Sequence, residues 1–283
     1  MLETAKPGDE IQLDAFLARF PETSMFLRGN LADHGIGSDD PHGTTFYVWQ
    51  DRSGIRAVFG RTNSGFLLTQ NPENNAEIAA EFAAKVASKP FVGMTGNADQ
   101  VPLVIDALGY PQDAYKLAVD QPLYSLNLAY LPPRLHVDNL RAPTSADESR
   151  LTEWFAQYEI DTGLSTPGPA VDNRAIKMAK RAIHRTTIQI YEEKGSPAAM
   201  TAFNAVLPDI VQVGGVFVRR DLRCKQIGRR VVASHLIEAR DRGVKQAILF
   251  AAAERAARCY EGIGFQKIGA YRLCLMADSE AEA

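Results

Sequence analysis

Residues 213–228 read Val-Gly-Gly-Val-Phe-Val-Arg-Arg-Asp-Leu-Arg-Cys-Lys-Gln-Ile-Gly, and this stretch decides the fold that we expect. It joins an apolar strand to a basic loop, and the loop ends on a glycine that opens a helix. The first backbone N–H groups of a helix have no partner within the helix, and the helix dipole makes this end positive. The stretch therefore predicts an anion site at the start of the helix.

A second strand and a second helix follow that site. Gln246–Phe250 is strand-like, and the next segment runs Arg255-Ala-Ala-Arg-Cys-Tyr-Glu-Gly-Ile-Gly-Phe265. Tyr260 lies in this helix, and Gly264 and Phe265 follow it. From these residues alone, a tyrosine that packs in the core is the simpler interpretation, because aromatic side chains at helical spacing usually fill cores.

Together the two segments resemble the GNAT superfamily of N-acetyltransferases, in particular its glycine N-acyltransferase-like branch. The branch signature Gly-Val-Tyr-Thr-Pro-Pro-Glu-Tyr-Arg corresponds to residues 215–223, and the phosphate motif Arg/Gln-x-x-Gly-x-Gly/Ala corresponds to residues 223–228. Gln226 replaces the middle glycine of that motif, and Ala253 replaces an asparagine often found seven residues before the tyrosine. The resemblance covers roughly residues 137–276 and depends on the order and spacing of its motifs.

The resemblance implies that the second half of the chain binds acetyl-CoA as a co-substrate. Backbone N–H groups of the loop would wrap the pyrophosphate, and basic side chains would add charge for the phosphates. The strand before the loop would splay from its neighbour, residues 198–206, and offer backbone groups to the pantetheine amides. The residues expected to bind the coenzyme are Val216, Phe217, Val218, Arg223, Cys224, Lys225, Gln226, Ile227, Gly228, Arg229 and Ala256.

The resemblance also gives Tyr260 the catalytic role. An amine that attacks a thioester forms a tetrahedral intermediate, which expels a thiolate. A phenol with a pKa of about 10 stays protonated at pH 7 and can protonate that thiolate. The sequence does not fix the base that takes the amine proton, and each candidate is also explained as a solvated surface residue. The candidates are Glu159, Asp161, His184, Glu192 and Glu193.

Other reactive side chains predict no further chemistry. Cys224 and Cys259 lie near the expected coenzyme, but no His–Cys pairing follows from the spacing, so we interpret both as small packing residues. The segment 33–42 contains Asp33, His34, Asp39, Asp40 and His42 without a fixed ligand spacing, so we predict a solvated turn and no metal site. The absence of G-x-x-x-x-G-K-[ST] and G-x-S-x-G disfavours P-loop and serine hydrolase chemistry.

Composition indicates a globular protein of two domains. The chain has 283 residues, 46% of them hydrophobic and 23% charged. A net charge of −3 gives no overall field that would attract nucleic acid or an anionic membrane. The sequence shows no apolar run long enough to span a membrane and no signal pattern, and its three cysteines form no spaced pair. We therefore expect a cytoplasmic protein.

The first half is predicted to contain two helices, three strands, a helix, a strand, a helix and a last strand at 122–131. The second half repeats that order, with strands expected at 187–192, 198–206, 210–218 and 246–250. We predict an α+β fold of two acetyltransferase-like domains, 1–131 and 137–283, each a mixed, mostly antiparallel sheet flanked by helices. The first domain is degenerate, because residues 69–75, at its phosphate loop, contain Glu73 but no glycine or basic residue. An unrelated α+β domain or a helical insert is the alternative. A stiff connection, 132–138, joins the halves.

The sequence thus predicts an N-acetyltransferase that moves an acetyl group from acetyl-CoA to an amine of a small molecule or amino acid, by direct attack in a ternary complex. One alternative is a non-catalytic acyl-CoA-binding or regulatory protein, to which Gln226 and Ala253 point. The other is an N-acyltransferase that uses a longer acyl-CoA. The expected partner is a small-molecule amine acceptor, with no nucleic acid and no membrane, and a homodimer is left open.

Overall fold

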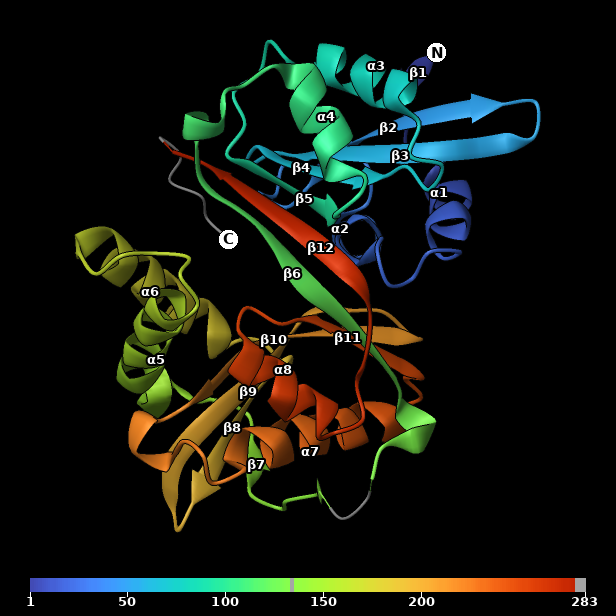
Figure 1. Ribbon diagram of the computed structural model, residues 1–283. Coiled ribbons are helices and arrows are strands. Elements are labelled where there is room, and N and C mark those ends of the chain that lie inside the picture. The colour runs from blue at the N-terminus through green and yellow to red at the C-terminus, as the bar shows by residue number, and fades with distance from the viewer. Residues whose placement is uncertain (133–134, 278–283) are drawn as a thin grey trace. The chain divides into compact units, whose positions relative to one another are not determined.

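The structure is a computed structural model that describes residues 1–132 and 135–277. Contacts divide the chain into two compact units (Figure 1). The N-terminal unit comprises Met1–Gln121 and Gly269–Ala283, and the C-terminal unit comprises Pro122–Ile268. Each unit has a mixed sheet with helices on both faces, so the predicted α+β fold class is confirmed. No helix among the described residues is long and apolar enough to cross a membrane.

The sheet of the N-terminal unit has the strand order β1-β2-β3-β4-β5-β12-β6. Its strands are β1 (Leu2–Thr4), β2 (Thr44–Asp51), β3 (Gly54–Thr62), β4 (Phe66–Gln70) and β5 (Gly93–Asn97), with parts of β6 (Tyr115–Asn127) and β12 (Gln266–Met276). Its helices are α1 (Glu10–Leu17), α2 (Met25–His34), α3 (Ala76–Val86) and α4 (Val101–Leu108). Strands β2, β3 and β4 are antiparallel neighbours, whereas β4 and β5 are parallel and α3 connects them.

Helix α3 illustrates how the sequence builds this unit. Asn75 precedes the helix, and its side chain accepts hydrogen bonds from the backbone N–H groups of Glu77 and Ile78. Buried side chains recur at helical spacing, and the ring of Phe82 stacks on Phe59 of β3 with centroids 4.5 Å apart. Helices α3 and α4 cover one face of the sheet, and α1 and α2 pack on the other (Figure 1).

The sheet of the C-terminal unit has the strand order β6-β11-β10-β9-β8-β7. Its strands are β7 (Leu140–Arg141), β8 (Ile188–Glu193), β9 (Ser196–Val206), β10 (Ile210–Val218) and β11 (Gln246–Phe250). Its helices are α5 (Glu148–Asp161), α6 (Pro169–Ala182), α7 (Ile227–Asp241) and α8 (Glu254–Glu261). Strands β8, β9 and β10 are antiparallel neighbours, whereas β10 and β11 are parallel and α7 connects them.

Two hydrophobic layers enclose the sheet of the C-terminal unit (Figure 1). On one face, Trp154 of α5 packs on Phe217 of β10, with ring centroids 5.5 Å apart. On the other face, α7 and α8 contribute Leu236 and Tyr260 to the core. Because both faces are covered, β10 and β11 carry nearly continuous apolar runs.

Two long strands each contribute to both units. The second part of β6 pairs antiparallel with β11, from Leu123 opposite Phe250 to Asn127 opposite Gln246. The second part of β12 pairs antiparallel with β5, from Tyr271 opposite Asn97 to Leu275 opposite Gly93. The neighbour of β5 in the N-terminal unit is therefore a strand from the end of the chain, and the neighbour of β11 comes from the first half.

These two strands account for most differences from the predicted elements. The strand predicted at 122–131 begins at Tyr115 and ends at Asn127, and no strand was predicted at 266–276. The units also differ from the predicted ranges 1–131 and 137–283, because 122–131 lies in the C-terminal unit and Gly269 onward in the N-terminal unit. Residues 133 and 134 of the predicted connection lie outside the described residues.

Candidate functional site

The connection between β10 and α7 leaves a helix start without a side-chain cap. Gln226 precedes α7, and its side chain makes no capping hydrogen bond. Among the residues that the structure describes, none accepts a hydrogen bond from the backbone N–H groups of Cys224–Arg229. Such free N–H groups at a helix start form the kind of anion site that the sequence predicts.

The backbone of this loop turns through two left-handed residues. Cys224 has φ 66° and Gln226 has φ 59°, and both side chains are exposed. A side chain in this conformation costs about 1–2 kcal/mol, which is why glycine is preferred there. The position that departs from the phosphate motif is thus one where the backbone favours glycine, and Gln226 adopts the required conformation under strain.

The strand before the loop is splayed, although not from the neighbour that we predicted. Strand β10 pairs with β9 from Val211 opposite Val206 to Val218 opposite Ala199, so the predicted separation from residues 198–206 is wrong. Two register shifts, one of them at Gly214, absorb the irregularity and keep this pairing. The parallel pairing with β11 instead ends at Val213 opposite Leu249, and β10 continues to Val218. The free backbone therefore faces the side of β11.

Arg223, the first basic residue of the motif, already has partners. Its Nη2 donates to Asp161 Oδ2 at 2.6 Å, its Nε donates to the carbonyl of Val218 at 2.9 Å, and its guanidinium lies over the ring of Phe217. Arg220 donates to the other oxygen of Asp161 at 3.0 Å. Burial works against ionisation of this carboxyl, but the two arginines lower the pKa of Asp161 below its usual value. Asp161 therefore neutralises part of the charge of the loop.

The remaining loop residues lie at different depths. Lys225 is exposed and donates from Nζ to the carbonyl of Asp221, whereas Ile227 is buried in the core under the loop. A Cβ on Gly228 would lie 3.4 Å from Val218 and 3.7 Å from Cys259 Sγ, in ordinary contact. The guanidinium of Arg229 lies so close to Gly262 that a Cβ there would overlap it, so this side chain packs against the end of α8.

The predicted acid lies beside this strand. Tyr260 is 9% exposed, and Val216 and Ala256 pack against the same hydrophobic cluster. Burial, with smaller effects of Tyr158 and Cys259, raises the pKa of Tyr260 far above its usual value, so the phenol keeps its proton. Phe217 faces the opposite layer, where it packs on Trp154, so only its backbone is available to a ligand in the splayed region.

Two residues near this site were not predicted. Tyr158 of α5 hydrogen-bonds the backbone of Gly215, at the irregular part of β10, and interacts electrostatically with Tyr260. Arg255 donates from Nη2 to the sulfur of Cys224 at 2.8 Å, so α8 brings a further cation to the loop. Tyr158 belongs to no local motif, and Arg255 opens the segment 255–265 but was not among the residues expected to bind the coenzyme. Only the pairing of elements that are distant in the sequence brings them to the site.

The candidate bases mostly have structural partners. Glu159 is 6% exposed rather than solvated, and its carboxylate accepts hydrogen bonds from Ser165 at 2.7 Å and Arg174 at 2.8 Å. Glu192 is held by Arg141, Glu193 accepts a hydrogen bond from Tyr191, and Asp161 binds the two arginines described above. The fifth candidate, His184, is exposed just after α6. These contacts favour structural roles for the four carboxylates.

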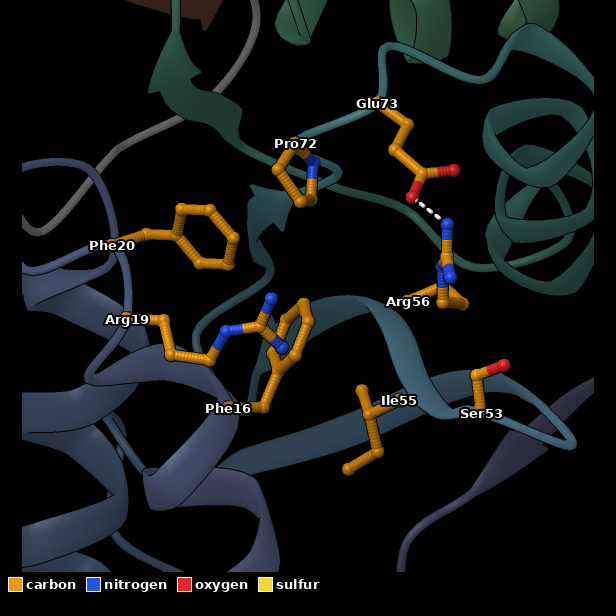
Figure 2. Close-up of a pocket in the computed structure, with 8 residues that line it drawn as sticks. All are labelled: Phe16, Arg19, Phe20, Ser53, Ile55, Arg56, Pro72 and Glu73. Carbon is orange, nitrogen blue, oxygen red and sulfur yellow. Dashed lines mark hydrogen bonds and ion pairs between the residues drawn. The ribbon is translucent and has the colours of Figure 1, made fainter.

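A pocket in the N-terminal unit lies at the loop between β4 and α3 (Figure 2). Pro72 and Glu73 of that loop line it, and Glu73 forms an ion pair with Arg56. Arg19 lies over the rings of Phe16 and Phe20 at 5.7 and 5.4 Å from their centroids. The loop that we predicted to have lost phosphate binding thus presents a carboxylate that is paired with an arginine.

Comparisons with known proteins agree with the motifs. Residues 149–265 match the model of the Acetyltransferase (GNAT) family. No curated protein matches the sequence closely enough to count as a relative. The family prediction is therefore confirmed for the second half of the chain, whereas the glycine N-acyltransferase-like branch stays a prediction.

Several solved structures share the fold over nearly the whole chain. A GCN5-related N-acetyltransferase from Kribbella flavida aligns with a TM-score of 0.56 and 16% identity, over 93% of this chain and 96% of that one. A GNAT-family acetyltransferase from Colwellia psychrerythraea aligns with a TM-score of 0.54 and 12% identity, over 97% and 99%. A tandem GNAT protein from the clavulanic acid biosynthesis pathway aligns with a TM-score of 0.54 and 10% identity, over 100% of both chains. At these identities the likeness shows the fold, including its tandem arrangement.

Proposed function

Because residues 149–265 match the model of the GNAT acetyltransferase family, we propose that the chain transfers the acetyl group of acetyl-CoA to an amine of a small molecule or amino acid. The observation that carries this proposal is the free start of α7, which follows the loop 219–226 after a strand that outruns its parallel neighbour. Free N–H groups suit a pyrophosphate, and unpaired strand backbone suits the amides of a pantetheine arm.

The coenzyme would be held mainly by backbone. The N–H groups of Cys224–Arg229 would bind the pyrophosphate, and those of β10 beyond Val213 would bind the pantetheine arm. Lys225 and Arg255 are exposed and would add positive charge around the phosphates. Arg223 would contribute fully only if its guanidinium left Asp161, so this carboxylate competes with the coenzyme for the arginine.

Tyr260 would act as the general acid. Transfer forms a bond between the amine nitrogen and the carbonyl carbon, and the carbon–sulfur bond then breaks. A proton held at the Tyr260 oxygen would neutralise the thiolate that leaves. The phenol is protonated at neutral pH, and the burial that raises its pKa makes it a weaker proton donor than a solvated tyrosine. We assign no carboxylate as the base, because Glu159 and Asp161 both hold arginines.

A second candidate function is acyl-CoA binding without catalysis, or transfer of a longer acyl group. The pairing of Arg223 with Asp161 and the strained Gln226 favour a weaker coenzyme site than a glycine-containing loop would give. Binding without catalysis differs from the proposed function in turnover, and transfer of a longer acyl group differs from it in the acyl-CoA that is used. A homodimer is compatible with both candidates and is part of neither.

A melt with acetyl-CoA, followed by an assay of thiol release with a panel of amines, tests the proposal. Ligand at about 100 times its dissociation constant should stabilise the protein by roughly 2.7 kcal/mol. Replacement of Tyr260 by Phe should lower turnover by about 100-fold or more and leave the shift in melting temperature unchanged. Tyr191→Phe is the matched control, because Tyr191 is also a buried tyrosine of the C-terminal unit but does not lie on α8.

The outcomes separate the candidates. A shift without thiol release for any amine would support acyl-CoA binding without catalysis. No shift with any acyl-CoA would contradict both candidates. Equal loss of turnover in Tyr260→Phe and Tyr191→Phe would contradict the role of Tyr260 as the acid.

A further inference from the structure

Three metal-ligating side chains converge between α2 and β2 in the N-terminal unit. His34 is the last residue of α2, and Asp40 and His42 belong to the loop that follows. Their ligand atoms all lie within 4.8 Å of one another. The spacing of these residues in the sequence predicted only a solvated turn, because five residues separate the first histidine from the aspartate.

The separations between donor atoms fit a common metal ion. His34 Nε2 lies 3.7 Å from Asp40 Oδ1, and His42 Nδ1 lies 3.5 Å from the same oxygen. Zinc binds imidazole nitrogen and carboxylate oxygen at about 2.0–2.2 Å, so adjacent ligands of a tetrahedral site lie about 3.3–3.5 Å apart. The two histidine rings are nearly parallel, with centroids 6.1 Å apart. Small rotations would complete the geometry.

Contacts from outside the three ligands fix the loop. Asn63 of the segment after β3 donates from Nδ2 to the carbonyls of Ser38 and Asp40, at 2.7 and 2.8 Å. The N–H of Gly43 donates to the carbonyl of Asp40 at 2.8 Å, and a Cβ on this glycine would overlap the carbonyl of Ser38. These bonds hold the backbone of Asp40, and the N–H of His42 donates to Asp40 Oδ1 at 2.8 Å, so the carboxylate is already oriented before any ion binds.

One aspartate between two histidines is also the arrangement of a simple ion pair. A histidine at the end of a helix interacts favourably with the helix dipole when it is protonated, and His34 occupies such a position. At His136 and Asp138, by contrast, a single histidine faces the carboxylate, with Nδ1 and Oδ1 3.2 Å apart. Convergence of two imidazoles on one oxygen favours a cation that neutral imidazoles and a carboxylate share.

We propose that His34, Asp40 and His42 bind one divalent first-row transition-metal ion, zinc in particular. Imidazole suits zinc, copper, iron and nickel, and one carboxylate fits zinc better than the harder magnesium and calcium ions, which take oxygen ligands. All three side chains are at least partly exposed, so the ion can enter from solvent and a water can complete the site. This site is independent of the proposed transfer reaction.

Zinc binding by the full-length chain without a polyhistidine tag tests the proposal. Competition with a chromogenic chelator should give one zinc per chain. Replacing His34 or His42 by Ala, or Asp40 by Asn, should weaken binding by more than about 10-fold, because even outer-shell partners of metal ligands contribute about 10- to 100-fold. Cobalt(II) added to the unmodified protein should give the visible absorption of four-coordinate cobalt, and zinc should abolish it.

Matched variants separate this site from other donors. Asp39→Asn changes the exposed neighbour of Asp40, His136→Ala removes the other His–Asp pair, and Cys224→Ser removes an exposed thiol. All three controls should bind zinc as the unmodified chain does. The proposal fails if the chain binds no stoichiometric zinc, or if the control variants reduce binding as much as loss of His34 and His42. Should the ligand variants not fold, the absence of cobalt absorption in the unmodified chain would itself refute it.

Discussion

The two units contain the same crossover with different helix starts. In the N-terminal unit, β4 leads through α3 to the parallel strand β5, and in the C-terminal unit β10 leads through α7 to the parallel strand β11. Helix α3 is capped by Asn75, and Asn71 hydrogen-bonds the backbone of Asn75. Helix α7 has no side-chain cap, and basic residues precede it.

If the proposed function holds, this difference separates a structural crossover from one that binds a ligand. In the N-terminal unit, the protein satisfies its own helix start, and the nearby Glu73 is paired with Arg56. In the C-terminal unit, the helix start remains free, and its strand outruns the parallel partner by five residues, from Val213 to Val218. A free helix end is costly unless solvent or a ligand satisfies it, so we expect its retention to reflect binding.

The largest effect is expected from cutting the chain at the predicted domain boundary. The fragment 137–283 lacks the part of β6 that pairs with β11, and with it four buried side chains of the core: Tyr124, Leu126, Leu128 and Leu131. Their burial is worth roughly 6–12 kcal/mol, which is comparable to the whole stability of a domain. We expect no cooperative thermal transition by circular dichroism.

The fragment 122–268 is the matched control for that cut. It keeps all residues of the C-terminal unit and should unfold cooperatively. A fragment 137–283 that melts as sharply as 122–268 would show that β6 is dispensable and that the predicted boundary is the physical one.

The next largest effect comes from a buried histidine on α7, whereas the buried face of α3 is wholly apolar. His235 of α7 is 0% exposed, both of its ring nitrogens lack a hydrogen-bond partner among the described residues, and its ring stacks on Phe203. Burial, with a smaller effect of the charge of Arg242, lowers the pKa of His235 to about 3. The unfolded chain takes up this proton near pH 6.5 and the folded chain does not, so the contribution is complete above pH 6.5 and is lost as the pH falls toward 3.

At pH 5 the loss is about 2 kcal/mol relative to pH 7. Chemical denaturation at both pH values measures it, and the variant His235→Leu should lack this part of the pH dependence. His136→Ala is the control, because that histidine is exposed at a surface pair. An equal pH dependence in His235→Leu and the unmodified chain would assign the effect to other groups.

Removal of the α3 cap should have a smaller effect. Asn75→Ala leaves the N–H groups of Glu77 and Ile78 without their acceptor, and loss of such a cap costs about 1 kcal/mol. A denaturant titration measures the change, with Lys89→Ala, an exposed residue beyond the helix, as the control. Acetyl-CoA should not begin to stabilise the variant through α3, because Glu73 still repels an anion. If the variant bound acetyl-CoA at α3, the cap alone would be what prevents binding there in the unmodified chain.

The smallest effect tests the strained position of the other crossover. Gln226→Gly relieves a left-handed side chain and should stabilise the protein by about 0.5–1 kcal/mol. If the proposed function holds, affinity for acetyl-CoA should rise, because the phosphate loop regains its middle glycine. Ile227→Gly is not equivalent, since Ile227 is buried, and should destabilise the protein. A destabilised Gln226→Gly variant would mean that the side chain makes a contact that offsets the strain.

Local pattern predicted the crossover of the C-terminal unit well. Ile210–Val218 and Gln246–Phe250 are strands at their predicted bounds, because each is a short apolar run between turn residues. The basic loop with one glycine likewise predicted unpaired N–H groups at the start of α7. These features depend on neighbours within a few residues, which the sequence displays directly.

The local pattern could not predict contacts between segments that are far apart in the sequence. Strand β12 lies on β5, far earlier in the sequence, and its first residues are exposed and do not alternate. The bond between Arg223 and Asp161 joins residues 62 positions apart, and the burial of Glu159 depends on Arg174 of another helix. The sequence shows that Arg223 is a cation of the loop, but it could not show that the carboxylate of Asp161 is paired with it.

During synthesis, the sheet of the N-terminal unit cannot be completed until β12 has been made. The N-terminal unit is translated first, yet the strand that pairs with β5 is made of residues 271–275, near the end of the chain. At about 5–20 residues per second, roughly 10–35 seconds separate the synthesis of β5 from that of its partner. During this interval the ribosome-bound chain exposes an unpaired strand edge, which is prone to association with other chains. The edge of β5 therefore stays exposed to association with other chains until β12 has been synthesised.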